Sequence, residues 1–313
     1  MSNYLVTGGA GFIGSNIAEA LAQRGENVRV LDNLSTGKEE NMAPFMDKID
    51  FQKGDIRSEG DVKKALKDID FVVHQAALRS VARSVEEPVE TNDVNVNGTL
   101  NLLMLAKEAC IKRVVYASSS SVYGDCEVFP QKETSTPKPI SPYAVSKLAA
   151  EYYCRMFSKT IGLETVSLRY FNVFGPRQNP ESKYSAVIPA FISRLAEDQP
   201  CIIDGDGKQS RDFTFISNVV DANIAACEVP GISGTVFNVA CGHDYSVIDV
   251  AENLKKIMGK EIESVHGPRR QGDVMKTYAD ISGLKNVLGV EPKVDFLEGL
   301  KRTVEWFVKG RGK

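Results

Sequence analysis

The sequence predicts an α/β fold of the Rossmann type, a doubly wound parallel sheet with helices on both faces and a smaller α/β domain attached. Short apolar runs alternate with helix-length segments through the first half of the 313 residues, which is typical of such sheets. A glycine-rich turn joins the first run to the first helical segment. Beyond about Asn172 the alternation breaks, because prolines and an Asp-Gly-Asp-Gly turn divide the chain.

The apolar runs give the expected order of the elements. Buried strands are expected at residues 5–6, 28–31, 71–73, 114–117 and 165–169, with one more before Asp55. Helical spacing of apolar residues predicts helices at 13–24, 59–67, 94–110, 143–159, 247–257 and 296–308. We expect residues 1–171 to form the larger domain, with segments near 213–250 returning to it, and residues 172–212 and 251–313 to form the smaller one.

Composition and charge narrow the class of protein. Hydrophobic residues make up 42% and charged residues 25% of the chain, as in globular proteins. The net charge of −3 argues against a general affinity for nucleic acid or an anionic membrane. The six cysteines form no CxxC pair, and His74, His243 and His266 lack metal-ligand spacing, so we expect no metal site. Scattered thiols, with no signal peptide or membrane span recognisable, predict a cytoplasmic protein.

The turn that ends at Gly14 has the spacing of a dinucleotide-binding site. Gly8 allows a tight turn, Gly11 lets a pyrophosphate approach the backbone, and Gly14 lets the helix pack closely on the strand. The N–H groups at the start of the helix can then bind phosphate. Asp32 ends the second strand, where a carboxylate accepts hydrogen bonds from ribose hydroxyls and repels a 2′-phosphate. The sequence therefore predicts that NAD binds here in preference to NADP.

Tyr143 and Lys147 lie one turn apart on the same face of a predicted helix. A free tyrosine, with a pKa near ~10, is a poor base at neutral pH. Lowering that pKa by ~3 units takes ~4 kcal/mol, which an ammonium one turn away and a nicotinamide cation together can supply. A pair at this spacing is most often a surface pair, but in a chain with a nucleotide-binding half it indicates a catalytic base.

Four serines, 118 to 121, follow the strand that precedes this helix. Ligands bind at the carboxyl ends of the strands in such sheets, so hydroxyl groups here are candidates for the site. A polar turn that merely caps the strand would account for Ser118, but not for all four.

The motifs occur in an order that resembles the extended short-chain dehydrogenases/reductases. The shared segments are TGGAGFIGS, SSSSVYG, SPYAVSK, RYFNVFGPRQNP, RDFTFI and RRQGDV. The likeness runs from Asn3 to about Trp306 and lies in the nucleotide-sugar epimerase branch, nearest to the UDP-N-acetylglucosamine 4-epimerases. It implies a UDP-sugar substrate, whose C4 is oxidised to a ketone and reduced again from the other face of the ring, so that C4 is inverted and NAD is regenerated.

The resemblance implies a role for each matching position. Tyr143 is the base, Ser119 shares the hydrogen bond of the sugar 4-OH, and Lys147 lowers the pKa of the tyrosine and holds the nicotinamide ribose. The positions implied to bind NAD are Gly8, Gly11, Phe12, Ile13, Gly14, Asp32, Asn33, Asp55, Ile56, Ala76, Ala77, Tyr143, Lys147 and Tyr170. The positions implied to bind the UDP-sugar are Arg79, Ser80, Ser119, Ser120, Ser121, Tyr143, Asn172, Ala186, Val187, Arg211, Arg270, Asp273 and Thr277. Planar arginine donors match diphosphate oxygens, which suits Arg211 and Arg270.

The preferred sugar is predicted from the size of one side chain. In the 4-epimerases the position of Thr277 controls the room for the C2 substituent while the sugar turns, and a small side chain admits an N-acetyl group. With Ser80, Ser121 and Ala186, Thr277 resembles the roomy wall of the N-acetylhexosamine type. This predicts interconversion of UDP-GlcNAc and UDP-GalNAc, and admits activity on UDP-Glc and UDP-Gal. Arg79 departs from the pattern, since its position is often glycine in the N-acetyl-specific relatives and basic in the glucose type.

Three alternatives remain to be weighed against this reading. The dehydratases carry an Asp-Glu pair at the positions of Ser120 and Ser121. Without these two carboxylates the chain lacks the acid catalysis that dehydration requires, so we do not expect a dehydratase. UDP-glucuronate epimerases differ at Asn172 and Asn179, which disfavours that substrate unless Arg79 or Arg177 binds the carboxylate. A non-catalytic NAD-binding protein is the remote alternative, because Tyr143 and its partners are all retained. In this family the helices near 94–110 and 142–159 form a dimer interface, so a homodimer is expected, although a core-facing role also explains their apolar faces.

Overall fold

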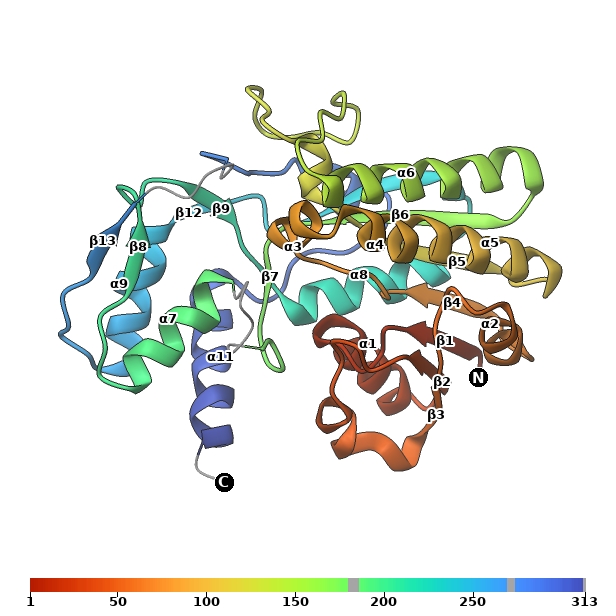
Figure 1. The fold of residues 1–313 in the computed structure, drawn as a ribbon, viewed down its shortest axis with the longest axis horizontal. Coiled ribbons are helices and arrows are strands. Elements are labelled where there is room, and N and C mark those ends of the chain that lie inside the picture. The colour runs from red at the N-terminus through yellow and green to blue at the C-terminus, as the bar shows by residue number, and fades with distance from the viewer. Residues whose placement is uncertain (180–185, 269–273, 312–313) are drawn as a thin grey trace.

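The computed structural model describes residues 1–179, 186–268 and 274–311 and is built around a seven-stranded parallel sheet (Figure 1). Its strand order is β11-β6-β5-β4-β1-β2-β3. The strands are β1 (Asn3–Thr7), β2 (Asn27–Asp32), β3 (Ile49–Lys53), β4 (Phe71–His74), β5 (Arg113–Ser119), β6 (Glu164–Tyr170) and β11 (Thr235–Val239). β1 pairs with β2 on one side and β4 on the other, so the strand order reverses there. Ligands bind in such sheets at the carboxyl ends of the strands beside this reversal.

Helices cover both faces of the sheet because alternate strand residues point to opposite sides. Tyr4 and Val6 of β1 belong to the apolar core shared with α1 (Phe12–Gln23) and α8 (Ile216–Glu228). Leu5, between them, belongs to the core on the opposite face. That face is covered by α2 (Glu59–Leu66), α5 (Gly98–Glu108) and α6 (Pro142–Met156).

Three two-stranded ribbons form the smaller part of the molecule, at the left of Figure 1. They pair β7 (Val173–Phe174) with β10 (Thr214–Phe215), β8 (Ile202–Asp204) with β13 (Val265–Gly267), and β9 (Ser210–Asp212) with β12 (Asp244–Ser246). The helices beside them are α7 (Val187–Ala196), α9 (Val247–Met258) and α11 (Phe296–Arg311). Between β10 and β12 the chain returns to the large sheet, where α8 packs on one face and β11 forms an edge.

The remaining helices are short. They are α3 (Val81–Glu86), α4 (Pro88–Asn92), α10 (Ser282–Asn286), the 3-10 helices η1 (Glu39–Asn41), η2 (Ala43–Lys48) and η4 (Ser120–Tyr123), and the π-helical η3 (Asp93–Asn97) and η5 (Phe157–Ile161). Among the described residues, no helix combines the length and the apolar character that crossing a bilayer requires.

The structure confirms the predicted fold class and the strands and helices expected from apolar spacing. Two expected helices are not uniform, because π-helical η3 opens the segment that continues as α5, and π-helical η5 closes α6. The sequence patterns do not predict α7, which contains Pro189, or α8, which is rich in β-branched residues that favour helices weakly. The boundary between the two domains stays a prediction.

Candidate active site

The glycine turn between β1 and α1 leaves space for a ligand next to the backbone. Gly8 has a φ of +69°, and a Cβ atom there would lie 2.7 Å from the nitrogen of Ala76. A Cβ atom on Gly14 would lie 2.2 Å from the carbonyl oxygen of Gly8, so only glycine permits this helix to approach the strand. The first turn of α1 carries no acidic side chain, which leaves its N–H groups and helix dipole available to an anion.

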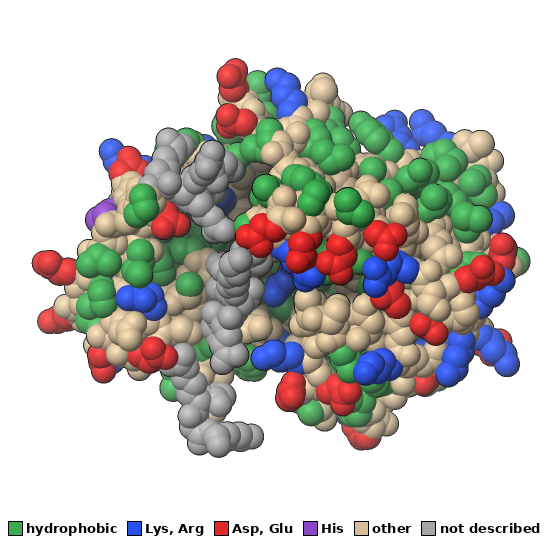
Figure 2. Space-filling view, viewed as in Figure 1, with side chains coloured by type: hydrophobic (Ala, Val, Ile, Leu, Met, Phe, Trp, Pro, Cys, Tyr) green, Lys and Arg blue, Asp and Glu red, His purple; other side chains and the backbone are tan. Residues whose placement is uncertain are grey.

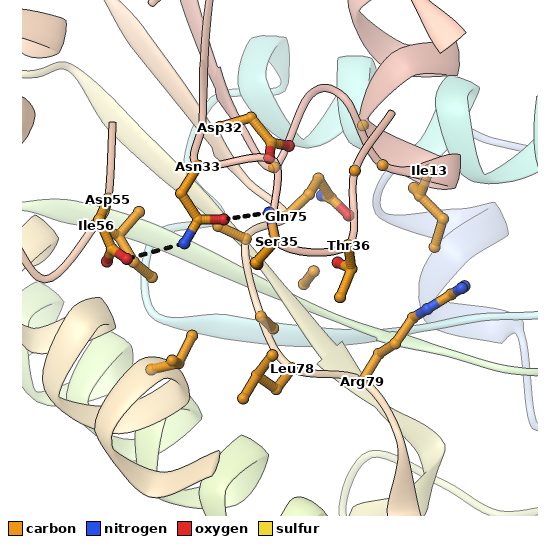
Figure 3. A pocket seen from close by; sticks show the side chains of 18 of the residues that line it. Ile13, Asp32, Asn33, Ser35, Thr36, Asp55, Ile56, Gln75, Leu78 and Arg79 are labelled. Atoms are coloured by element: carbon orange, nitrogen blue, oxygen red, sulfur yellow. Dashed lines mark hydrogen bonds between the residues drawn. The ribbon is translucent and has the colours of Figure 1, made fainter. Parts of the chain in front are cut away.

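Asp32 at the end of β2 is held in place by the turn. Its Oδ2 accepts a hydrogen bond from the nitrogen of Ala10 at 2.9 Å, and its Oδ1 accepts one from the nitrogen of Leu34 at 2.8 Å. The carboxyl group is 8% exposed, and this burial raises its pKa although the two backbone bonds oppose the rise. Figure 3 shows Asp32 at the rim of the cavity, where a ribose hydroxyl can reach it.

All fourteen residues implied to bind NAD line one cavity in the larger part of the molecule. Asn33 and Asp55 meet at its far end, where the amide of Asn33 donates to the carboxylate at 2.8 Å (Figure 3). Tyr143, Lys147 and Tyr170 line the other end. The cavity therefore joins the carboxyl ends of six neighbouring strands, β6, β5, β4, β1, β2 and β3, as a dinucleotide that crosses the strand-order reversal requires.

Sequence reasoning missed several residues of this cavity. They include Ser35, Thr36, Gly37, Arg57, Gln75 and Leu78. Ser35 to Gly37 follow Asp32 in a polar turn after a strand, so their position at the sheet edge was a usable signal. Arg57 had no such signal, because its side chain is placed by ion pairs with Asp55 and the distant Asp93.

Lys147 lies one turn after Tyr143 on α6. This helix starts at Pro142, and the side chain of Ser141 caps its first turn. The ammonium donates a hydrogen bond to the carbonyl oxygen of Ala117 at 3.0 Å and lies 5.9 Å from the centre of the Tyr143 ring. Burial lowers the pKa of Lys147 to about 7. The lysine is thus fixed between the end of β5 and the tyrosine.

The environment of Tyr143 acts on its pKa in two directions. Burial raises this pKa, while a side-chain hydrogen bond with Ser119 and the positive charge of Arg79 oppose the rise. The net effect of these groups is to raise the pKa of Tyr143 above its ordinary value. The expectation that Lys147 lowers the pKa of this tyrosine stays a prediction for the protein with NAD bound.

The four serines have different environments. Ser118 is 3% exposed and donates to the carboxylate of Glu151 at 2.7 Å, which is a structural bond. Ser119 faces Tyr143, and its Oγ accepts hydrogen bonds from the nitrogen and the hydroxyl of Ser121 at 3.2 and 2.9 Å. Ser120 and Ser121 begin η4 at the same strand end. Ser119 is thus the serine of this segment that shares a hydrogen bond with Tyr143, and its catalytic role stays a prediction.

A second cavity lies between the large sheet and the smaller part of the molecule. Of the residues implied to bind the UDP-sugar, it is lined by Arg79, Asn172, Ala186, Val187 and Arg211. Arg79 also lines the first cavity, so the two cavities meet at its side chain. A ligand in the second cavity can therefore reach Tyr143, which faces Arg79.

The other implied sugar ligands occupy different places. Thr277 is 8% exposed, and its Oγ1 accepts a hydrogen bond from the amide of Asn172 at 3.2 Å. Ser80 caps α3 by accepting from the nitrogen of Arg83 at 3.1 Å. Arg270 and Asp273 lie outside the described residues.

A glycine turn at a strand-order reversal, an acidic strand end and a Ser-Tyr-Lys set define an enzyme of the short-chain dehydrogenase/reductase class. Residues 4–240 match the model of the NAD dependent epimerase/dehydratase family, and the chain belongs to that family. Its cofactor is NAD, which the cavity around Gly8, Gly14 and Asp32 fits.

The chain is similar over nearly its whole length to enzymes that act on UDP-sugars. A putative UDP-glucose 4-epimerase of Methanocaldococcus jannaschii is 39% identical over 96% of this chain and 97% of its own. A UDP-glucuronate 4-epimerase of Thermodesulfobacterium geofontis is 34% identical over 98% and 96%. A UDP-N-acetylglucosamine 4-epimerase of Methanobrevibacter ruminantium M1, solved in complex with UDP-N-acetylmuramic acid, is 41% identical with a TM-score of 0.94, over 99% of both chains.

Proposed function

We propose that the protein inverts C4 of a UDP-hexose, with UDP-GlcNAc and UDP-GalNAc as its preferred pair and UDP-Glc and UDP-Gal as further substrates. One observation carries the proposal. Tyr143, hydrogen-bonded to Ser119, lines the NAD cavity and faces Arg79, the side chain that this cavity shares with a second cavity lined by Asn172 and Arg211. A tyrosine placed between a nicotinamide site and a separate anchoring site suits oxidation and reduction of one carbon on a tethered ligand.

The residues divide the chemistry among them. Tyr143 accepts the proton of the sugar 4-OH, and Ser119 keeps the phenol and that hydroxyl in one hydrogen-bond system. NAD, held by the residues around Gly8, Gly14 and Asp32, would supply the acceptor and donor of the C4 hydride. Arg211 lines the second cavity, and its guanidinium is the group that we expect to bind the diphosphate. The 4-keto sugar carries no charge, so it is held less firmly than the diphosphate and can turn about that anchor before Tyr143 returns the proton.

The small side chain of Thr277 supports an N-acetylated sugar. The Thr277 hydroxyl accepts a hydrogen bond from the amide of Asn172, a residue that lines the second cavity. The hydrogen bond also orients Asn172 toward the second cavity, which it lines. An amide so placed can bind ring hydroxyls on either face of a turning sugar.

A UDP-uronate is the second candidate, and Arg79 is the observation that favours it. In the described part of the chain its guanidinium forms no ion pair, although it lines both cavities. An arginine that faces a ligand cavity without an acidic partner is suited to a carboxylate. The same charge also suits a diphosphate, which both substrate classes carry.

Incubation with UDP-GlcNAc, UDP-Glc and UDP-GlcA in separate reactions tests the proposal. Proton NMR distinguishes the C4 epimers by the coupling constants of H4. We expect equilibration of the GlcNAc and GalNAc forms, with slower conversion of UDP-Glc. Conversion of UDP-GlcA alone would replace the proposed substrate, and conversion of none of the three would refute the proposed reaction.

We propose further that the enzyme is a cytoplasmic homodimer. Exposed apolar side chains gather on α3 to α6, and Figure 2 shows this area at the upper right. It includes Val85, Val89, Met104, Val145 and Tyr152, which are each at least half exposed. A contiguous apolar surface of this kind is typical of an interface. All six cysteines are free thiols, which suits a reducing compartment.

A further inference from the structure

A buried ion pair joins Glu151 of α6 to Arg169 of β6 behind the catalytic cavity. The carboxylate accepts two hydrogen bonds from the guanidinium, Nη2 to Oε1 at 2.6 Å and Nε to Oε2 at 3.0 Å. Both side chains are almost fully enclosed, with 3% of the glutamate and 4% of the arginine exposed. Such a two-pronged bond fixes orientation as well as distance, because both groups are planar.

The same carboxylate holds the end of β5. Ser118 donates to Oε2 of Glu151 at 2.7 Å, and Ser118 is the register partner of Arg169 in the sheet. The next pair in this register is Ser119 opposite Tyr170, and both of these residues belong to the candidate site. Glu151 therefore connects directly to the strand residues that precede the catalytic hydroxyl and the wall of the NAD cavity.

On its own helix, Glu151 lies in line with the catalytic groups. Tyr143, Lys147 and Glu151 are spaced four residues apart on α6, so they share one face. A shift or rotation of α6 relative to β5 would change the separation of Tyr143 from Ser119. Glu151 resists that movement, because its two oxygens bond to both strands.

We propose that the Glu151–Arg169 pair is a positioning device that sets the hydrogen bond between Ser119 and Tyr143 and so tunes the catalytic base. The proposal rests on the proposed function in taking Tyr143 as that base. Replacing a buried ion pair by apolar side chains often leaves stability unchanged or improved, so stability alone is a weak account of its presence. Fixing the register between a helix and two strands is a use that fits its contacts.

The ring of Tyr123 extends the device. The guanidinium carbon of Arg169 lies 4.7 Å from its centre, and the Tyr123 hydroxyl donates to Oδ1 of Asn238 at 2.6 Å. Tyr123 ends η4, the short helix that begins at Ser120 directly after the catalytic serine. The guanidinium of Arg169 thus also contacts the segment that follows Ser119, through the ring of Tyr123.

Glu151→Gln tests the proposal by two measurements on the NAD-loaded protein. The first is the pH titration of the Tyr143 hydroxyl, followed by ¹³C NMR of tyrosine Cζ without sugar and assigned with Tyr143→Phe. Within the described ranges, Arg79, Lys147 and Tyr116 are the other titratable groups that face this phenol, and all are retained. Because the Ser119 bond lowers the tyrosine pKa, we expect the midpoint to rise by about half a unit or more. The second is turnover, for which we expect kcat to fall about tenfold with KM changed by less than about twofold.

Glu164→Gln is the matched control. Arg113 and Glu164 form a second Arg–Glu pair across the same two strands, at the opposite end of their register. This variant should lower thermal stability but leave the Tyr143 midpoint and kcat unchanged. If Glu151→Gln folds and shows the same pattern as Glu164→Gln, the pair is only structural and the proposal is wrong.

A double variant covers the case in which Glu151→Gln does not fold. Glu151→Leu with Arg169→Met removes both charges, which a core tolerates better than one unpaired charge. If the double variant folds and its Tyr143 titration has a higher midpoint pH than wild type, the result supports the positioning role of the ion pair. If the midpoint equals that of wild type, the result overturns the proposal. The NMR readout needs no sugar, so inactivity of the wild type on every UDP-sugar would refute the proposed function and still leave this proposal decided.

Discussion

The ammonium of Lys147 lies 5.9 Å from the centre of the Tyr143 ring and donates to the carbonyl oxygen of Ala117, 3.0 Å away. The lysine is therefore tied to the end of β5 and is not free to swing away from the tyrosine. Its ordinary pKa is lowered to about 7 by burial, so this charge is sensitive to whatever anion or dipole the cavity receives.

Tyr143→Phe should abolish turnover and keep NAD bound. The variant loses only the phenolic oxygen, and loss of a positioned acid–base group costs about 10²- to 10⁴-fold in kcat. Turnover is measured by NMR and NAD content by absorbance after denaturation. Tyr152→Phe on the same helix, where the ring is 52% exposed, is the control and should behave as wild type. Undiminished turnover in Tyr143→Phe would exclude this residue as the base.

Lys147→Met should move the acid limb of the pH–activity profile to higher pH. Activity requires the ionised form of Tyr143 and is lost as the pH falls through the pKa of that group. Without the neighbouring cation the tyrosinate is less stable, so its pKa rises, by about one unit for about 1.4 kcal/mol of lost interaction. The limb is read from kcat/KM between pH 5 and 10 with NAD in excess. An unchanged limb would show that the Arg79 charge, not Lys147, controls the tyrosine.

Asp32→Asn should weaken NAD and reduce discrimination against NADP. The amide can still accept one of the two backbone hydrogen bonds at this site, but it has no negative charge to repel a 2′-phosphate. We expect the Kd for NAD to rise about tenfold, equivalent to about 1.4 kcal/mol. Calorimetric titration of nucleotide-free protein measures both cofactors. Asp50→Asn, at a carboxylate 53% exposed in the neighbouring strand, should change neither Kd.

The sequence predicted the large sheet and the NAD cavity well because both depend on local patterns. Gly8 and Gly14 are required by the backbone itself, and Asp32 and Asp55 follow strands whose ends meet at one edge. Strand ends in a parallel sheet converge whatever the rest of the chain does. Every residue implied to bind NAD therefore lines the same cavity.

The sugar site was less predictable because it is assembled from distant segments. Asn172 and Thr277 meet because both contact β9. The amide of Asn172 donates to the carbonyl oxygen of Asp212, and the segment at 276–277 is hydrogen-bonded beside the same strand. Ser80 follows Arg79 in the sequence, yet it caps a helix while Arg79 lines both cavities. The four-residue spacing from Tyr143 and Lys147 could have predicted that Glu151 shares their face of α6. No sequence pattern predicted its partner Arg169, which lies on strand β6.

Asp212 should make the stability of the protein depend on pH. Burial raises the pKa of this carboxyl to about 7, although the backbone N–H groups of Cys241, Ala279 and Gly242 oppose the rise. Between its ordinary pKa near 4 and about 7, the folded protein holds a proton that the unfolded chain releases. The stabilisation is thus complete below that range and is lost as the pH rises through it, at up to about 1.4 kcal/mol per pH unit.

Urea unfolding of Asp212→Asn at pH 5, 6, 7 and 8 checks this dependence. The variant cannot release this proton. Its free energy of unfolding should therefore fall less steeply with rising pH than that of wild type between pH 5 and 8. Asp221→Asn, whose carboxylate pairs with Lys293 at the surface, should keep the wild-type slope. Equal slopes in wild type and Asp212→Asn would mean that the carboxyl is ionised throughout.

Thr277→Tyr should convert the enzyme toward plain hexoses. The backbone of Thr277 is fixed by two hydrogen bonds to β9, since its nitrogen donates to Ser210 and its carbonyl accepts from Asp212, and this opposes movement of the backbone away from a larger side chain. Its ring must then occupy the space beside Asn172 that an N-acetyl group needs while the sugar turns. We expect kcat/KM for UDP-GlcNAc to fall about 10- to 200-fold, the range of a steric contact, with UDP-Glc affected only a few-fold.

Thr277→Val keeps the size but removes the hydroxyl that accepts from Asn172, so it separates volume from hydrogen bonding. If the valine variant loses UDP-GlcNAc activity as strongly as the tyrosine variant, orientation of Asn172, and not room for the C2 substituent, determines the choice of sugar.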